Sequence, residues 1–132
     1  MRNISFMLTP GQIVDGSKTV TRRLGWLHLR PGDLLQGVEK GMGLRKGEKV
    51  RRLRTIRVVD VRPEALSAMT ADPEYGRAEC AREGFGNHPE LREPAAFVTF
   101  FCRTHRGCRP ETTVTRIAFE YVDGHANEAD QS

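Results

Sequence analysis

The sequence has no long apolar stretch, because none of its hydrophobic runs approaches the roughly 20 residues that a membrane-spanning helix requires. A hydrophobic fraction of 38% and a mean hydropathy of -0.51 are typical of a small globular protein in water. The opening residues, MRNISFML, are too short and too mixed for a secretory leader. We therefore expect no membrane partner and a cytoplasmic location.

Cysteine is scarce, and an odd number of three without a secretory leader indicates free thiols in a reducing compartment. No internal repeat or linker divides the 132 residues, a length that suits one domain with its own core. The last ten residues, DGHANEADQS, are polar and predict a disordered tail. The expected organisation is a single domain over residues 1–122 and a tail over 123–132.

Acidic residues are sparse in the first half of the chain. Residues 1–62 carry 14 Lys and Arg against 5 Asp and Glu, whereas residues 63–132 carry 7 against 12. Only Glu48 opposes the densest basic run, which consists of Arg45, Lys46, Lys49, Arg51, Arg52, Arg54 and Arg57. Such a run is an electrostatic footprint for nucleic acid, and it is equally typical of a solvated hairpin with no partner.

Cap and turn residues predict the elements of the first half. Thr9 and Gln12 form the pattern of a capping box ahead of a helix of about two turns, and Gly16 fits the end of that helix. Strands are expected at residues 3–8, from about residue 19, at 33–39 and at 50–61. A glycine-rich basic loop, 40–49, joins the last two strands, and Pro63 is expected to end the second of them.

Helix signals dominate the second half. One helical turn is expected at 64–69, a short helix at 78–83, a long helix at 94–105 and an alternating strand at 113–122. Phe97, Phe100 and Phe101 of the long helix are expected in the core. Strands joined by both hairpins and helices predict an α+β fold. Arg-rich strands favour a small, partly open, mixed β-barrel with flanking helices.

The segment GSKTVTRR, residues 16–23, places a lysine, two threonines and two arginines after the expected end of a helix. Residues 18 and 21 of a regular strand point to opposite faces. Lys18 and Thr21 therefore share one site only if Lys18 lies in the turn after Gly16 and the strand begins near residue 19. In an ordinary strand they are a solvent-exposed lysine and a cross-strand threonine.

Four short motifs, taken in order, resemble an ASCH domain (activating-signal-cointegrator homology domain), which has a PUA-like β-barrel fold. They are G-x-K-T-V-T-x-R at 16–23, L-x-P-G-D at 29–33, E-G-F at 83–85 and I-x-F-x-Y at 117–121. The resemblance spans roughly residues 3–122 and depends on motif order, since each motif alone is unspecific. It implies association with RNA or a nucleoside. One bacterial branch of the family deacetylates N(4)-acetylcytidine with a lysine, a threonine and a glutamate.

The resemblance to that branch implies catalytic residues in this chain. Its lysine matches Lys18, and its threonine, three residues on, matches Thr21. Its glutamate matches Glu83 best, with Glu79 and Glu74 as alternatives because the loop lengths differ. The implied roles are Thr21 as nucleophile, Lys18 as its base and Glu83 as a proton shuttle.

A binding module is the other main hypothesis for the same segment. Arg22 and Arg23 then line a pocket for a base or nucleotide, while the basic run contacts phosphates. Under the amidohydrolase hypothesis, the charge of either arginine lowers the pKa of Lys18, and a lysine that acts as a base requires such a lowered pKa. Trp26 follows these arginines and either stacks on a base or packs against the core.

A third hypothesis is a zinc-stabilised interaction domain. Cys102, His105 and Cys108 form C-x-x-H-x-x-C, and Cys80 or His88 would have to supply the fourth zinc ligand. Cysteine and histidine on the apolar face of a helix are also ordinary packing residues. We therefore expect that the protein binds no metal and no cofactor. We expect its partner to be RNA or a nucleoside or nucleotide, and we expect the protein to be a monomer.

Overall fold

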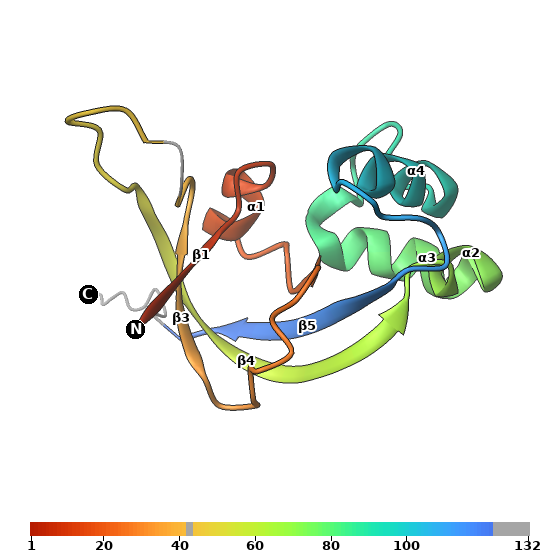
Figure 1. Cartoon of the computed structure of the whole chain (residues 1–132), viewed down its shortest axis with the longest axis horizontal. Helices are drawn as coiled ribbons and strands as arrows, with labels where there is room; N and C mark the ends of the chain where they lie inside the picture. The colour runs from red at the N-terminus through yellow and green to blue at the C-terminus, as the bar shows by residue number, and fades with distance from the viewer. Residues whose placement is uncertain (42–43, 123–132) are drawn as a thin grey trace.

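The computed structural model describes residues 1–41 and 44–122, and among them it contains one five-stranded sheet (Figure 1). The strands are β1 (Arg2–Ser5), β2 (Val20–Arg23), β3 (Leu34–Val38), β4 (Arg52–Ala65) and β5 (Thr113–Tyr121). The helices are α1 (Pro10–Val14), α2 (Ala68–Ala71), α3 (Pro73–Cys80) and α4 (Pro94–Thr104). A further helical turn, Ala81–Phe85, continues α3. The expected tail, 123–132, lies outside the described residues.

The sheet order is β1-β3-β4-β5-β2, with β1 parallel to β3 and the other neighbours antiparallel. Register shifts interrupt the β3–β4 and β4–β5 ladders, and such bulges bend and twist a sheet. The sheet therefore curls into a half-barrel, with α1 inside the curve and α2, α3 and α4 at the far end of β4 and β5 (Figure 1). This mixed α+β architecture confirms the expected fold class.

Strand β4 continues beyond its expected end, through Pro63 to Ala65. Its partner β3 pairs with it only from Arg52 to Arg57, so the later half of β4 pairs with β5 alone. Pro63 stands opposite Thr115 on β5. A proline on the open side of an edge costs no ladder hydrogen bond, which is why the expectation that Pro63 ends the strand is wrong.

Two helix boundaries also differ from the expectation. The turn expected at 64–69 forms only at Ala68–Ala71, because residues 64 and 65 remain in β4. The helix expected at 78–83 begins earlier, at Pro73, where the Asp72 side chain accepts a hydrogen bond from the Tyr75 backbone N–H. That aspartate caps the helix, and the proline suits its first turn.

The start of α1 is built differently from a capping box. The Thr9 side chain makes no capping hydrogen bond, and Gln12 Nε2 donates instead to the Gly84 carbonyl oxygen at 3.2 Å. The expected capping box is therefore wrong, and Gln12 instead ties α1 to the turn after α3. Gly16 has a φ of 81°, so the left-handed residue expected after this helix is present.

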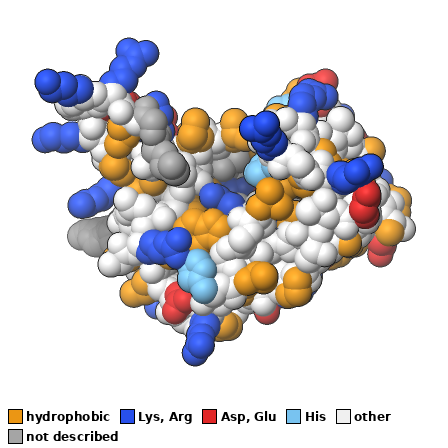
Figure 2. All heavy atoms as spheres, in the orientation of Figure 1, with side chains coloured by type: hydrophobic (Ala, Val, Ile, Leu, Met, Phe, Trp, Pro, Cys, Tyr) orange, Lys and Arg blue, Asp and Glu red, His pale blue; other side chains and the backbone are white. Residues whose placement is uncertain are grey.

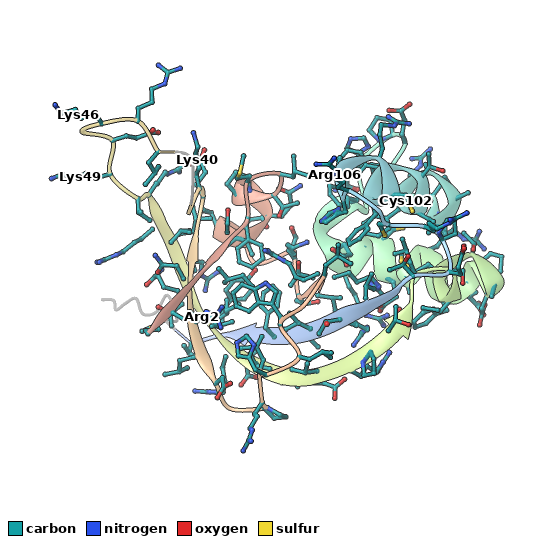
Figure 3. The ribbon with its side chains drawn as sticks, in the orientation of Figure 1. Arg2, Lys40, Lys46, Lys49, Cys102 and Arg106 are labelled. Carbon is teal, nitrogen blue, oxygen red and sulfur yellow. The ribbon has the colours of Figure 1, made fainter. Side chains whose placement is uncertain are left out.

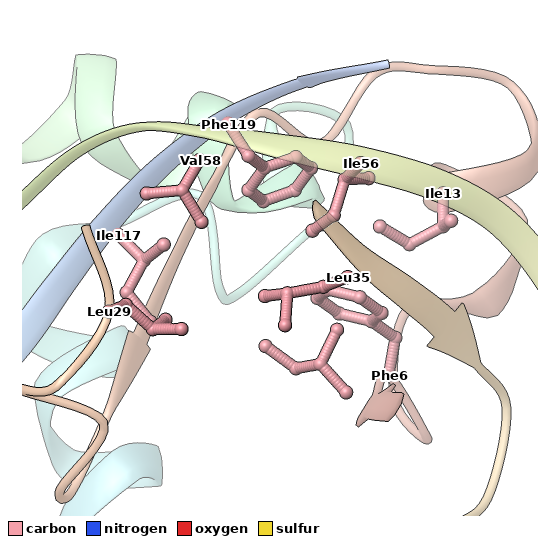
Figure 4. Close-up of a cluster of buried hydrophobic side chains, with 9 residues drawn as sticks. Phe6, Ile13, Leu29, Leu35, Ile56, Val58, Ile117 and Phe119 are labelled. Atoms are coloured by element: carbon pink, nitrogen blue, oxygen red, sulfur yellow. The ribbon is translucent and has the colours of Figure 1, made fainter. Parts of the chain in front are cut away.

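Buried side chains form two clusters. The first fills the curve of the sheet and includes Phe6, Ile13, Leu35, Ile56 and Phe119 (Figure 4). The second lies beneath α4 and includes Leu66, Met69, Cys80, Phe97 and Phe101. No helix in the described part of the chain is both long and apolar enough to cross a membrane.

Gly76 is the position at which the backbone of α3 lies close against α2 and α4. A Cβ atom there would lie 1.9 Å from the Met69 carbonyl oxygen and 2.6 Å from Pro94 Cγ. Only glycine therefore permits this packing of α3 against α2 and α4.

Candidate functional site

A cavity of about 270 Å³ lies between the N-terminal segment, β2, the turn after α3 and α4. Its charged and hydroxyl lining includes Lys18, Thr21, Arg22, Arg23 and Glu83. Its aromatic lining includes Phe6, Phe85, Phe97, Phe100 and Phe101. Figure 2 shows the molecule hollowed between its two halves, with basic side chains inside the hollow. Polar groups that converge in a largely apolar cavity are typical of a small-molecule site.

The backbone of Lys18 is fixed in the turn before β2. Its N–H donates to the Gln12 carbonyl at 3.2 Å, and the Tyr121 hydroxyl donates to its carbonyl at 2.6 Å. The neighbouring Thr19 N–H donates to the Arg82 carbonyl at 2.8 Å. Because Lys18 precedes the strand, its side chain and that of Thr21 both line the cavity, which meets the geometric condition set by the sequence.

The Lys18 ammonium group is buried, with the residue only 4% exposed. Its Nζ lies 3.0 Å from Glu83 Oε1 and donates to the Glu83 backbone carbonyl at 2.7 Å. Burial lowers the pKa of Lys18; Glu83 opposes this shift, and the cations Arg23 and Arg22 add to it. These are the conditions under which a lysine side chain can serve as a base near neutral pH.

The Glu83 carboxylate is shared between Lys18 and Arg22, whose Nη1 lies 3.1 Å from Oε2. Arg22 also contacts Glu79 at 2.5 Å and Glu64 at 2.8 Å. Although burial works against its charge, Glu83 and the other two carboxylates raise the pKa of Arg22. Arg22 is therefore a fixed cation that orients Glu83.

The two alternative acids lie elsewhere. Glu79 is fully buried but does not line the cavity, and its carboxylate accepts hydrogen bonds from Arg116, Arg22 and Arg82. Burial disfavours its charge, yet these hydrogen bonds lower the pKa of Glu79 to about 2. Glu74 is exposed in the first turn of α3. Of the three glutamates, Glu83 is the one that the structure brings to Lys18 and Thr21.

Thr21 and Arg23 lie two residues apart in β2 and point to the same side of the strand. Thr21 is 4% exposed, and its Oγ1 accepts a hydrogen bond from Arg23 Nε at 3.1 Å. A second Arg23 nitrogen donates to the Ser5 carbonyl, and the guanidinium carbon lies 5.1 Å from the centre of the Phe6 ring. Burial lowers the pKa of Arg23 to about 10, although Glu83 opposes the shift.

The aromatic wall of the cavity is the feature that the sequence analysis missed. Phe97 and Phe101 are core residues, as expected, but they also line the cavity. The expectation that Phe100 lies in the core is wrong, because its half-buried ring faces the cavity instead. His105 completes this wall, with its ring stacked 3.8 Å from that of Phe101. The helical spacing of 97, 101 and 105 was visible in the sequence, but the element facing it was not.

The long basic run lies outside the cavity. None of its seven residues lines the cavity, and Lys46 and Lys49 project from a loop at the edge of the molecule (Figure 3). Arg51 pairs with Glu39 at 2.5 Å, Arg57 pairs with Glu120 at 2.7 Å, and Arg54 lies over the Tyr121 ring. Within residues 1–41 and 44–122, the exposed cations without a carboxylate within 4.0 Å include Arg45, Lys46, Lys49 and Arg52.

Trp26 also lies outside the cavity. Its half-buried ring packs against the first core cluster and stacks on His28, with 5.8 Å between the ring centres. The Arg2 guanidinium lies 4.5 Å from the centre of the Trp26 ring. The structure therefore places Trp26 in contact with the core, a histidine and an arginine.

The zinc hypothesis lacks a ligand set in the described residues, where no group of three or more His, Cys, Asp or Glu is arranged to hold a metal ion. The sulfur atoms of Cys102 and Cys108 are 4.0 Å apart. His105 Nδ1 lies 2.9 Å from the Phe101 carbonyl oxygen, and its ring forms part of the cavity wall. Cys80 is buried in the second core cluster.

Comparisons with known proteins bear on the fold. The sequence matches no protein-family model and no curated protein. The structure is similar to an ASCH domain from Lactobacillus crispatus JV V101, with 15% identity, a TM-score of 0.53, and coverage of 91% of this chain and 79% of that one. It is also similar to a DUF984 protein from Enterococcus faecalis V583, with 16% identity, a TM-score of 0.51, and coverage of 92% and 81%. The chain therefore has the fold of an ASCH domain.

Proposed function

We propose that the cavity binds a single acylated nucleoside of the N(4)-acetylcytidine type and hydrolyses its amide bond. The observation that carries this proposal is the buried contact of 3.0 Å between Lys18 Nζ and Glu83 Oε1, in the cavity that the Thr21 hydroxyl also lines. A hydroxyl nucleophile, an amine base and a carboxylate proton carrier are the three groups that amide hydrolysis requires. The ASCH fold, together with the resemblance of the sequence motifs to the deacetylating branch of that family, supports the same reaction.

The size and lining of the cavity support a small substrate. A volume of about 270 Å³ lies just below the range of roughly 300–1,000 Å³ that is usual for small-molecule sites. Such a volume suits one nucleoside and excludes a folded nucleic acid. Aromatic side chains on its wall suit the flat faces of a base.

In the proposed first step, neutral Lys18 takes the hydroxyl proton of Thr21 as Oγ1 attacks the amide carbon. The π electron pair of the carbonyl moves onto its oxygen. That pair then re-forms the carbonyl as the C–N bond breaks, and the proton passes from Lys18 through Glu83 to the departing nitrogen. The products of this step are the free amine of the nucleoside and an acyl ester on Thr21.

In the second step, a water molecule attacks the ester carbon and gives a proton to Lys18. The carbonyl re-forms as the bond to Thr21 Oγ1 breaks, and Oγ1 recovers the proton. The overall reaction converts one amide and one water into an amine and a carboxylic acid, and all three side chains return to their initial states.

The test is the release of cytidine from N(4)-acetylcytidine by wild-type protein, Thr21→Val and Thr21→Ser. Valine preserves the shape of threonine without its hydroxyl, so turnover is expected to disappear, whereas serine keeps the nucleophile and is expected to retain turnover. Lys46→Ala, a change on the exposed loop, is the matched control and is expected to match the wild type. Turnover by Thr21→Val at the wild-type rate would refute the nucleophile, and a folded wild-type protein without turnover would refute the reaction.

A second candidate function is RNA binding by the exposed basic run. The observation that favours it is that Arg45, Lys46, Lys49 and Arg52 are exposed and have no carboxylate partner within the described residues. Cations without a protein partner are free to neutralise phosphates. The ASCH fold supports RNA binding in general terms, and this surface would act independently of the cavity.

The salt dependence of RNA affinity tests this second function. Four phosphate contacts on a single strand predict that log K falls against log salt with a slope of about -3. The double variant Lys46→Glu/Lys49→Glu is expected to bind RNA more weakly and to show a shallower dependence of log K on log salt. Arg103→Glu, at an exposed position of α4, is the control and is expected to change neither. An affinity that is insensitive to salt, or equal losses in both variants, would exclude a role of the loop.

A further inference from the structure

Among the described residues, the Lys, Arg and Glu side chains that line the cavity are in direct ion pairs, with the exception of Arg23. Lys18 contacts Glu83, Arg22 contacts three glutamates, and Arg116 contacts Glu79 at 2.6 Å. Arg23 has no carboxylate within 4.0 Å among the residues that the structure describes. Arg23 is half-buried, and Glu83 acts on its charge without contacting it. Within the described residues the cavity therefore holds a guanidinium that has no direct ion-pair partner.

The Arg23 guanidinium is held in place by neutral groups. Nε donates to Thr21 Oγ1 at 3.1 Å, Nη2 donates to the Ser5 carbonyl, and the group lies over the Phe6 ring. A guanidinium has five N–H donors. Both N–H groups of Nη1 lack an acceptor in the described part of the chain, and the side chain lines the cavity. These donors are therefore available to a ligand beside the Thr21 hydroxyl.

We propose that Arg23 is a catalytic residue that binds the oxyanion formed when Thr21 attacks the amide carbonyl. This inference rests on the proposed hydrolase function. The oxyanion is bonded to the same carbon as Thr21 Oγ1, so it forms next to the atom that Arg23 Nε already contacts. Arg23 neither gains nor loses a proton in this step, because it donates hydrogen bonds to the oxygen that receives the carbonyl electron pair.

Because no described carboxylate contacts Arg23, this interaction favours the transition state over the substrate. The amide substrate is neutral, so Arg23 gains no ion-pair partner when the substrate binds. Negative charge develops on the carbonyl oxygen only during attack and collapse, and at that point it pairs with Arg23. An interaction that strengthens only in the transition state accelerates the reaction without tightening substrate binding.

The first arm of the test separates kcat from KM in Arg23→Gln and Arg23→Lys, with N(4)-acetylcytidine as substrate. Removal of the charge is expected to lower kcat by about 100- to 1,000-fold with little change in KM, and lysine is expected to restore part of the loss. Arg103→Gln is the control for a remote arginine. An unchanged kcat in Arg23→Gln, whether or not KM rises, would overturn the role of Arg23 while leaving the hydrolase function intact.

The second arm uses methylphosphonate, a tetrahedral anion that resembles the intermediate. It is expected to inhibit the wild type competitively and to lose this inhibition in Arg23→Gln, while inhibition by the product cytidine persists. Circular dichroism shows whether Arg23→Gln is folded, and Arg23→Lys keeps the charge if it is not. Retained phosphonate inhibition in folded Arg23→Gln would overturn the inference. An inactive, folded wild type would instead overturn the proposed function on which it rests.

Discussion

Replacement of Glu79 by glutamine should remove the electrostatic centre of the buried network. The Glu79 carboxylate is fully buried and accepts hydrogen bonds from Arg116 at 2.6 and 3.0 Å, from Arg22 and from Arg82. Glutamine has the same shape and keeps one acceptor oxygen, so Glu79→Gln isolates the charge. Arg22, which also orients Glu83, would lose one of its three carboxylate partners.

The expected magnitude follows from the pKa of Glu79. A value of about 2 in the folded chain against an ordinary 4.5 corresponds to about 3 kcal/mol of stability at neutral pH. Because the folded pKa is the lower of the two, this contribution is complete above pH 4.5. It is lost progressively as the pH falls from 4.5 through about 2.

Urea unfolding at a series of pH values between neutral and about 2 measures this contribution. The wild type is expected to exceed Glu79→Gln by about 3 kcal/mol at neutral pH, and the difference should shrink toward zero near pH 2. Glu90→Gln, at an exposed loop position, is the control and should differ little from the wild type at any pH. A neutral-pH difference below about 1 kcal/mol, or one that does not change with pH, would refute the reasoning.

Three further predictions concern packing. Gly84→Ala should lower the free energy of unfolding in urea by about 1–2 kcal/mol, because φ is 98° and the new methyl group would lie 3.0 Å from a neighbouring side chain. The control, Gly47→Ala, has a φ of 84° and no neighbour within 4 Å, so it should lower the free energy of unfolding by less. Equal losses in the two variants would contradict the contact argument. Gly76→Ala should lower the free energy of unfolding by about 1–3 kcal/mol or more, because the methyl group would meet a backbone oxygen at 1.9 Å. An unchanged unfolding midpoint would show that α3 packs against α2 and α4 more loosely than this distance indicates. Cys80 should resist thiol reagents in the native protein while Cys102 and Cys108 react, because Cys80 is fully buried and burial raises the pKa of its thiol to about 12. Rapid labelling of all three cysteines would contradict the place of Cys80 in the core.

The position of Lys18 could be predicted from the sequence because its determinants are local. Gly16 marks a left-handed residue after a short helix, and the β-branched residues that follow it favour a strand. These features favour a turn at residue 18, between the helix end and the strand. The resemblance to an ASCH domain was also local in origin, since each of its motifs is a short continuous segment, although I-x-F-x-Y lies within β5 rather than at a turn.

The choice among the three glutamates depends on long-range packing and could not be made from the sequence. Glu79 and Glu83 are four residues apart, so helical spacing places both on one face, and both contact Arg22. Only the approach of β2 and α1 to the turn after α3 brings Glu83 to Lys18. The extension of β4 through Pro63 has a similar cause, since the shortness of its neighbour β3 decides it.

The rate of cytidine release from N(4)-acetylcytidine by wild-type protein and by Lys18→Met, measured side by side by chromatography, tests the central claim most directly. Methionine is a similarly long, unbranched side chain that fills the cavity wall but accepts no proton. The account predicts turnover by the wild type and a loss of more than about 100-fold in the variant, with both proteins folded. Equal rates in the two proteins, or no turnover by the folded wild type, would contradict it.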